Sequence, residues 1–193
     1  MSASGRVAVV TGASRGAGRG IAVALGAHGW RVYVTGRSIA DSGTAELVSA
    51  AGGVGVAVPV DHADDDAVAR LFARVRDEDG GLDLLVNNAA VIHDELTGAK
   101  PFWEKPVELG DVLDVGLRSA YVASWHAAPL LITRPRALIA FTSSPGSVCY
   151  MHGPPCMSVC RMGVSSCYAP PFSTKAHVTA SRTRKAQALS LFG

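Results

Sequence analysis

Three glycines at fixed spacing follow the first apolar run of the chain, in the segment 11–18 (TGASRGAG). At such a junction between a strand and a helix, Gly12 permits a tight turn, Gly16 lets the backbone approach a phosphate, and Gly18 lets the helix pack closely on the strand. The free N–H groups at the start of the helix bind the pyrophosphate of a dinucleotide. The residues that we expect to contact such a ligand are Gly12, Ser14, Arg15, Gly16, Ala17 and Gly18.

The end of the second apolar run bears on which dinucleotide would bind. An acidic residue at that place accepts hydrogen bonds from the ribose 2′-hydroxyl and repels a 2′-phosphate. Here Gly36 and Arg37 occupy it, and Arg15 lies in the glycine-rich segment. Two guanidinium groups favour a 2′-phosphate through their charge and their fork geometry. We therefore expect NADP, with NAD as the less favoured cofactor; the alternative is that Arg37 is only a solvated residue at a helix start.

Alternating strands and helices must position these residues, and the apolar pattern of the first 141 residues predicts them. The expected strands are 7–10, 32–35, 54–60, 82–86 and 137–141. Four helices are expected. The first follows the glycine-rich segment as far as Gly29, the second begins at Asp41 or Ser42, the third begins at the acids 64–66, and the fourth covers 107–128. This order predicts an α/β fold: a Rossmann-type doubly wound parallel sheet in three α/β/α layers, with its C-terminal part incomplete.

Charge is distributed unevenly along the 193 residues, although the net charge is only +2. Residues 1–114 hold all 16 acidic residues and 10 of the basic ones, whereas residues 115–193 hold 8 basic residues and no acid. One interpretation is a basic face for nucleic acid, and the other is the loss of a normal acidic segment. Because the basic residues are scattered and few aromatic residues lie among them, we expect no nucleic-acid partner.

All four cysteines, Cys149, Cys156, Cys160 and Cys167, also lie in the basic half. Their spacing matches neither a CxxC pair nor a zinc ribbon, so we expect unpaired thiols and no metal site. No apolar run is long enough to predict a membrane span. No signal peptide precedes the first strand, and we therefore expect a cytoplasmic protein in a reducing compartment.

The glycine-rich segment, Asp61 after the third predicted strand and the NNAA sequence at 87–90 together resemble the short-chain dehydrogenase/reductase family over residues 6–153. Three further segments, 101–106 (PFWEKP), 115–118 (VGLR) and 143–147 (SSPGS), are similar to its dehydrogenase/reductase member 1 subgroup. The resemblance implies that Asp61 lies beside the adenine and that Asn88 borders the cofactor. It also implies that Gly116 stands where many members carry an active-site Asn.

The activity implied by the resemblance is hydride transfer between NADP(H) and a small hydrophobic carbonyl or alcohol. In the family, a Ser after the fifth strand binds the substrate oxygen, a later Tyr supplies the proton, and a Lys one helical turn beyond it binds the nicotinamide ribose. Ser144 occupies the Ser position, but the Tyr and Lys positions fall on Cys156 and Cys160, and the chain contains no YxxxK sequence. In the family this Tyr and Lys lie on a helix after the fifth strand, and the lack of that helix would also weaken the homo-oligomer that the resemblance implies.

Two accounts of this gap fit the sequence. Either the catalytic helix is deleted between Pro155 and Arg161, or everything after about Pro154 is out-of-frame or foreign sequence. We therefore divide the chain into an NAD(P)-binding domain at 1–153 and an irregular basic tail at 154–193. Three functions stay open: an oxidoreductase, a catalytically inactive dinucleotide-binding pseudoenzyme or truncated product, and a basic-tailed binding module.

Overall fold

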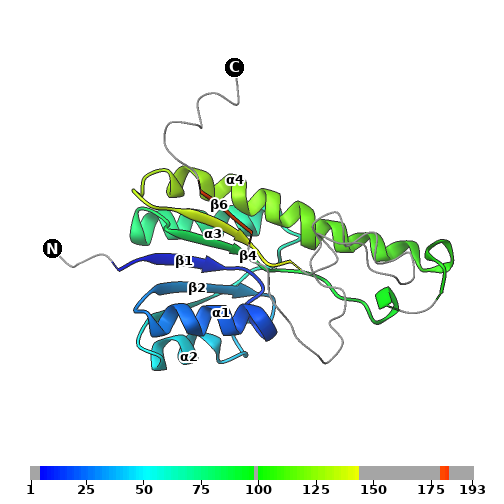
Figure 1. Cartoon of the computed structure of the whole chain (residues 1–193), viewed down its shortest axis with the longest axis horizontal. Helices are drawn as coiled ribbons and strands as arrows, with labels where there is room; N and C mark the ends of the chain where they lie inside the picture. Colours follow the sequence, from blue (N-terminus) through cyan, green and yellow to red (C-terminus); the bar gives the residue numbers. More distant parts are fainter. Residues whose placement is uncertain (1–4, 98–99, 144–178, 183–193) are drawn as a thin grey trace, which may run out of the picture.

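The computed structural model describes residues 5–97, 100–143 and 179–182. In this part of the chain, six strands form one sheet in the order β3-β2-β1-β4-β5-β6 (Figure 1). The five parallel strands are β1 (Val7–Val10), β2 (Arg31–Gly36), β3 (Val54–Pro59), β4 (Leu84–Asn87) and β5 (Leu138–Phe141). The direction of winding reverses between β1 and β4, so the predicted doubly wound parallel sheet is confirmed.

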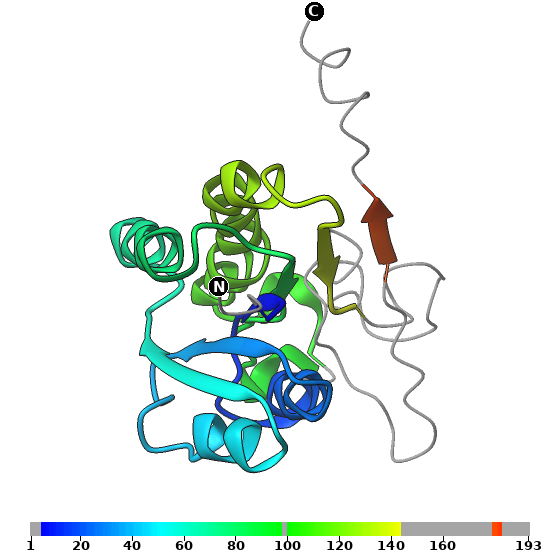
Figure 2. The same ribbon diagram turned by 90° about the vertical axis from the view of Figure 1, so that its left-hand side faces the viewer.

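Helices cover both faces of the sheet, which gives the predicted three layers (Figure 2). On one face lie α1 (Gly16–Ala27) and α2 (Thr44–Ala50), and on the other lie α3 (Asp65–Asp79) and α4 (Ser119–Leu131). Successive strand residues point to opposite faces. Accordingly Ala8 and Val10 of β1 pack with α1 and α2, whereas Val7 and Val9 pack with α3 and α4.

The predicted strand limits agree with the structure within two residues at either end. The N-terminus of α3 is also as predicted, because the Asp64 carboxylate accepts hydrogen bonds from the N–H groups of Asp66 and Ala67. For α2 the prediction was wrong, since Gly43 is the N-cap and offers no side-chain cap. The Ser42 hydroxyl nevertheless accepts a hydrogen bond from the Thr44 N–H at 3.2 Å. It therefore pairs one of the N–H groups that have no partner inside the helix, although Ser42 lies one residue before the N-cap.

The long helix predicted at 107–128 is correct in place but not in geometry. It consists of a 3-10 turn (η3, Val107–Gly110), a π-helix (η4, Leu113–Arg118) and then α4, which continues to Leu131. A π-turn accommodates one extra residue and commonly marks a functional site. Gly116 lies inside η4 and presents no side chain to the widened turn. The helix runs past residue 128 because Leu130 and Leu131 are buried against the sheet.

Strand β6 (Thr179–Arg182) pairs antiparallel with β5 at the edge of the sheet. It belongs to the segment 154–193, which was expected to be an irregular basic tail. The open edge of β5 presents backbone N–H and C=O groups that any extended segment can pair with, whatever its side chains. The other residues of that segment lie outside the described part of the chain.

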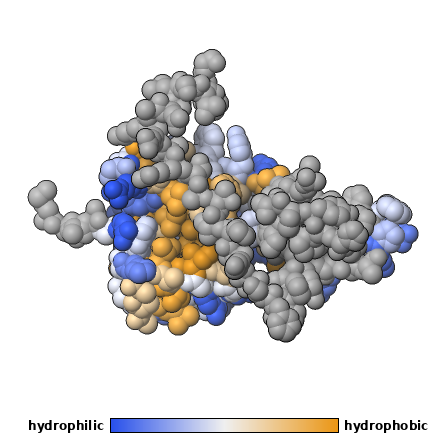
Figure 3. Space-filling model, viewed as in Figure 1, coloured by the Kyte–Doolittle hydropathy of each residue, from blue (hydrophilic) through white to orange (hydrophobic). Residues whose placement is uncertain are grey.

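Figure 3 shows a band of hydrophobic residues in the left-hand part of the face in view, with hydrophilic residues along its left margin. On the α1 side, the half-buried Ile21, Leu25 and Leu84 pack against the core beneath them. Among the described residues, no helix combines the length and the apolar character needed to cross a membrane.

Candidate functional site

The glycine turn, which we define as residues 11–18, lies at the carboxyl end of β1, at the point where the sheet order reverses. Two of its glycines, Gly12 and Gly18, are required by close packing. Gly12 has φ +64°, and a Cβ atom there would lie 2.7 Å from the Cα of Ala89. A Cβ atom at Gly18 would lie 2.4 Å from both the Asn88 Nδ2 and the Gly12 carbonyl oxygen. The turn therefore packs directly on the residues that follow β4.

Asn88 shapes this turn from the neighbouring strand. Its Nδ2 donates to the carbonyl oxygens of Thr11 at 2.9 Å and Gly12 at 3.0 Å. In return, the Thr11 hydroxyl accepts hydrogen bonds from the N–H groups of Asn88 and Ala89, at 2.8 and 2.9 Å. The side chain of Asn88 thus holds the turn in place, and its position beside a cofactor stays a prediction.

Among the described residues, no side chain caps the start of α1, which leaves it available to an anion. Its N-cap residue, Arg15, makes no side-chain cap, and the first turn contains no acid. Gly16 has φ +58°, and a Cβ atom there would meet nothing within 4 Å. In contrast, the start of α3 is occupied by the Asp64 carboxylate and two further acids. Free N–H groups and the helix dipole attract negative charge, so the start of α1 fits a phosphate and the start of α3 does not.

The end of β2 adjoins the glycine turn, and Gly36 there cannot carry a side chain unless the Ser14 side chain moves. Gly36 is buried, and a Cβ atom there would lie 2.7 Å from the Ser14 Oγ. Arg15 and Arg37, one from each segment, are both exposed. Within the described part of the chain, neither guanidinium has a carboxylate at ion-pair distance. This end of the site is therefore positively charged.

Asp61 follows β3 at the same edge of the sheet, because β3, β2 and β1 are parallel. Its side chain is exposed, and its Oδ1 accepts a hydrogen bond from the Ala63 N–H at 3.0 Å. The structure thus brings the glycine turn, Arg37, Asp61 and Asn88 to one edge. Their contact with a dinucleotide stays a prediction. Ser144 lies outside the described residues, as do the four cysteines.

His62 is a residue of this edge that the sequence analysis missed, since no spacing distinguishes it from the neighbouring solvated acids. It is 5% exposed, and its Nε2 lies 2.8 Å from the Thr35 hydroxyl, which itself donates to the Val10 carbonyl oxygen. The Thr35 oxygen therefore accepts the His62 Nε2–H, and Nδ1 has no hydrogen-bond partner among the described residues. Burial lowers the pKa of His62 to about 4, against the opposing attraction of Asp61.

This burial predicts a loss of stability in mild acid. The pKa of His62 is below that of an unfolded histidine, 6.5, so its contribution is complete above pH 6.5 and is lost as the pH falls toward 4. We expect the free energy of unfolding to fall by roughly 2 kcal/mol between pH 7.5 and pH 5. Urea unfolding at each pH measures this, and a His62→Leu variant should lose most of the slope.

Between pH 7.5 and pH 5, Glu78, the carboxylate whose pKa is lowered most clearly, does not contribute to the loss of stability. The ion pair and hydrogen bonds of Glu78 lower its pKa to about 2, so its contribution is lost only below about pH 4.5. If His62→Leu keeps the wild-type slope between pH 7.5 and pH 5, the assignment to His62 is wrong.

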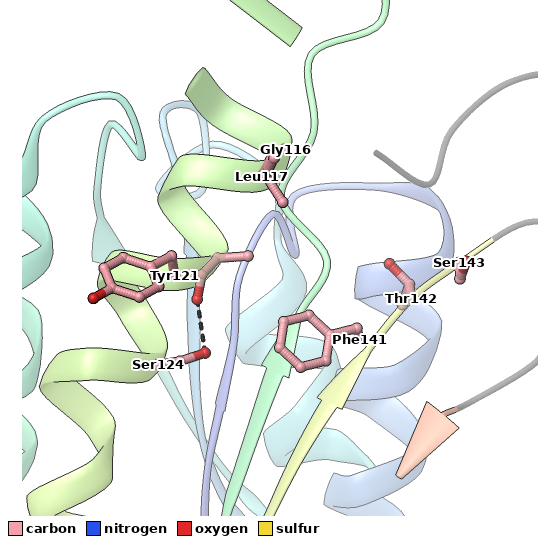
Figure 4. A pocket seen from close by; sticks show the side chains of 8 residues that line it. Gly116, Leu117, Tyr121, Ser124, Phe141, Thr142 and Ser143 are labelled. Carbon is pink, nitrogen blue, oxygen red and sulfur yellow. Dashed lines mark hydrogen bonds between the residues drawn. The ribbon is translucent and has the colours of Figure 1, made fainter. Parts of the chain in front are cut away.

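A pocket of about 460 Å³ lies between the η4–α4 helix and the end of β5 (Figure 4). Leu117 and Phe141 give it apolar walls, and the hydroxyl-bearing residues Thr142 and Ser143 lie at the strand end. Its remaining lining residues are Gly116, Ala120, Tyr121 and Ser124. The Ser124 hydroxyl accepts a hydrogen bond from the Asn87 Nδ2 at 3.0 Å, which holds it against the end of β4. The pocket suits a mainly apolar ligand bearing one polar group.

Neither described tyrosine can serve this pocket as a proton donor. In Figure 4 the ring of Tyr121 turns its hydroxyl away from Phe141 and Ser143. Tyr33 is fully buried and bonded to Glu78 and Asp79, and burial together with these hydrogen bonds raises its pKa well above its usual value. These two acids end α3, at the amino ends of the parallel strands, whereas the pocket lies at the carboxyl end of β5.

Comparisons with known proteins agree with this geometry. A family model described as short chain dehydrogenase matches residues 6–165. The "Dehydrogenase/reductase SDR family member 1" of Mus musculus is 42% identical over 159 residues, which are 78% of this chain and 50% of that protein. The Homo sapiens protein of the same name is 43% identical over 157 residues, or 79% and 50%. The chain thus spans about half the length of the curated relatives it matches.

A solved structure shows the same fold. The crystal structure of a metagenomic short-chain oxidoreductase in complex with NADP has a TM-score of 0.72 and 34% sequence identity to this chain. The likeness covers 85% of this chain and 73% of the other.

Proposed function

The chain belongs to the short-chain dehydrogenase family, and on that premise we propose that it binds NADP(H) for hydride transfer to or from a small hydrophobic carbonyl or alcohol. The observation that carries the proposal is the open start of α1 beside two exposed arginines, Arg15 and Arg37. The metagenomic relative, whose structure contains NADP, supports the same cofactor.

The glycine turn fits the diphosphate of a dinucleotide, because Gly16 leaves open space over a backbone that starts an uncapped helix. When bound, the nicotinamide would supply or accept the hydride. The protein's part is to bind and orient: Asn88 holds the turn, and the apolar walls of the pocket exclude water around a hydrophobic substrate. Ser144 directly follows the pocket residue Ser143, which supports a role in binding the substrate oxygen.

The preference for NADP can be reversed at one residue. An Arg37→Asp variant should bind NADP more weakly by roughly 1–3 kcal/mol, because it loses a charged hydrogen bond and gains repulsion, and it should bind NAD more tightly than NADP. Isothermal titration calorimetry with both nucleotides measures this. The matched control is Arg76→Asp, the same change on an exposed residue near the end of α3. Equal wild-type affinities for the two nucleotides would refute the NADP assignment.

A second candidate function is binding of the dinucleotide without turnover. It is favoured by Cys156 and Cys160, which stand where the family carries the proton-donating Tyr and the ribose-binding Lys. Tighter calorimetric binding of NADP than of NAD is expected for both candidates, and NADPH oxidation with hydrophobic ketones separates them.

Association with a second copy is supported by one face of the η4–α4 helix. Leu117, Tyr121 and Trp125 recur at every fourth position and are 44%, 70% and 64% exposed. Residues at this spacing form one stripe along a helix, and an exposed apolar stripe favours contact with another protein surface. We propose that the chain forms homo-oligomers through this stripe.

A further inference from the structure

Arg19, in the first turns of α1, connects two segments that lie far apart in the sequence. Its Nη2 donates to the Ser14 carbonyl oxygen at 2.5 Å and to the Ser42 carbonyl oxygen at 3.0 Å, and its Nε donates to the Thr44 Oγ1 at 3.2 Å. Ser14 belongs to the glycine turn. Ser42 belongs to the β2–α2 loop, which we define as residues 37–43. One half-buried guanidinium therefore joins the glycine turn to the loop that begins with Arg37.

Further hydrogen bonds connect the glycine turn to the end of β2 and to the start of α2, and we call this connected region the joint. The buried Thr44 hydroxyl donates to the Ala13 carbonyl oxygen at 3.0 Å, and the Ala13 N–H donates to the Thr35 carbonyl oxygen at 2.8 Å. Inside the loop, the Ser42 hydroxyl donates to the Ile39 carbonyl oxygen at 2.7 Å. Ile39 is almost fully buried, so the middle of the loop is anchored. Arg19 supplies the link between this anchored loop and Ser14.

The charge of Arg19 is not neutralised by these contacts. Its three acceptors are two carbonyl oxygens and a hydroxyl, and no carboxylate in the described part of the chain lies at ion-pair distance. Half-burying a cation without a counter-ion is unfavourable unless its hydrogen bonds are satisfied and an anion is near. The exposed Arg15 belongs to the glycine turn and the exposed Arg37 to the β2–α2 loop, so the two segments that Arg19 connects carry two further positive charges.

From these contacts we infer that Arg19 is a positioning residue that holds the β2–α2 loop against the glycine turn. It thereby presents Arg15 and Arg37 as a preformed site for a phosphate on the 2′ position of an adenosine ribose. The inference rests on the proposed NADP binding and adds a determinant of specificity to it. A loop that is ordered before binding loses less conformational entropy when the ligand binds, so the affinity for the extra phosphate is higher.

The planar fork of arginine is needed because the three acceptors come from different directions. A lysine at this position keeps the charge but presents a single ammonium group, which cannot replace Nη2 and Nε at once. Arg19→Lys therefore separates the charge from the fork, and Arg19→Met removes both. The matched control is Arg76→Met, which removes an exposed charge near the end of α3.

Calorimetric titration with NADP and with NAD tests the inference in the full chain. Arg19→Met should weaken NADP binding about tenfold or more while changing NAD binding by less than about threefold, with Arg19→Lys between it and the wild type. Arg76→Met should leave both affinities unchanged. Amide hydrogen exchange without nucleotide is the second readout. The Ile39 amide donates to the Gly36 carbonyl oxygen at the end of β2 and the Ser42 amide to the Ile39 carbonyl oxygen, and both should exchange faster in both Arg19 variants.

The outcomes are distinguishable. If the wild type prefers NADP, but the Arg19 variants keep that preference and the wild-type exchange rates, the inference is overturned and the proposed function stands. Equal losses for both nucleotides with unchanged exchange also overturn it. If the wild type itself binds the two nucleotides equally, the proposed NADP function fails, and Arg19 then has no phosphate to serve. If Arg19→Met does not fold, Arg19→Lys decides by the same two readouts.

Discussion

Oxidation of NADPH by this chain in the presence of hydrophobic ketones should be slower by a factor of about 10²–10⁴ than in a variant with a correctly placed proton donor. The physical reason is that an alkoxide develops on the substrate oxygen as the hydride arrives and must be protonated. In the proposed function Ser144 would bind that oxygen, but the family's donor position is Cys156 and its ribose-binding position is Cys160. Loss of the ribose contact also loosens the geometry of hydride transfer.

The structure strengthens this expectation, because the tyrosines among its described residues offer no substitute. Tyr121 lines the pocket with its hydroxyl turned away from Ser143, and Tyr33 is bonded to acids at the opposite edge of the sheet (Figure 4). Two further tyrosines, Tyr150 and Tyr168, lie outside the described residues.

The assay is NADPH oxidation with a panel of hydrophobic ketones, and Ser144→Ala is the control for chemistry at the proposed site. The double variant Cys156→Tyr with Cys160→Lys should raise the rate if residues 154–165 form a helix, because a helix brings side chains four positions apart next to each other on one face. Fast turnover by the wild type that Ser144→Ala abolishes would show that another residue donates the proton, and the prediction would be wrong.

The largest expected effect on stability comes from replacing Gly18 with alanine. The new Cβ atom would lie 2.4 Å from both the Asn88 Nδ2 and the Gly12 carbonyl oxygen, which are themselves hydrogen-bonded at 3.0 Å. Neither partner can move without breaking the contact between the glycine turn and the residues after β4. Overpacking combined with the loss of a partly buried hydrogen bond should reduce the free energy of unfolding by about 2–4 kcal/mol.

The same helix contains the matched control. Gly20 lies two residues further along α1, and a Cβ atom there would meet nothing within 4 Å. Gly20→Ala should therefore increase stability by about 0.5–1 kcal/mol, since alanine loses less backbone entropy than glycine when the helix forms. Urea unfolding of both variants measures the difference. Equal effects of the two substitutions would contradict the close packing of Gly18 on Asn88.

Local patterns in the sequence were sufficient for the order of the elements and for the position of the candidate dinucleotide site. The apolar runs predicted β1 to β5 within two residues, and the aspartates at 64–66 predicted the start of α3. The glycine turn was predictable because its requirements are those of one strand, one turn and one helix that follow each other directly. In the same way, Arg37 was identified because its place depends only on the end of β2.

Only the tertiary structure determined which distant segments lie together. The pocket joins Leu117 of the helix to Phe141 at the end of β5 and to Ser143 beyond it, and Arg19 connects Ser14 with Ser42. His62 was indistinguishable from its solvated neighbours until the fold buried it against Thr35. The physical reason is that apolar periodicity records which face of an element is buried, but not which element covers it. The neighbours of each strand are decided by the crossover connections and by side-chain packing between segments remote in sequence.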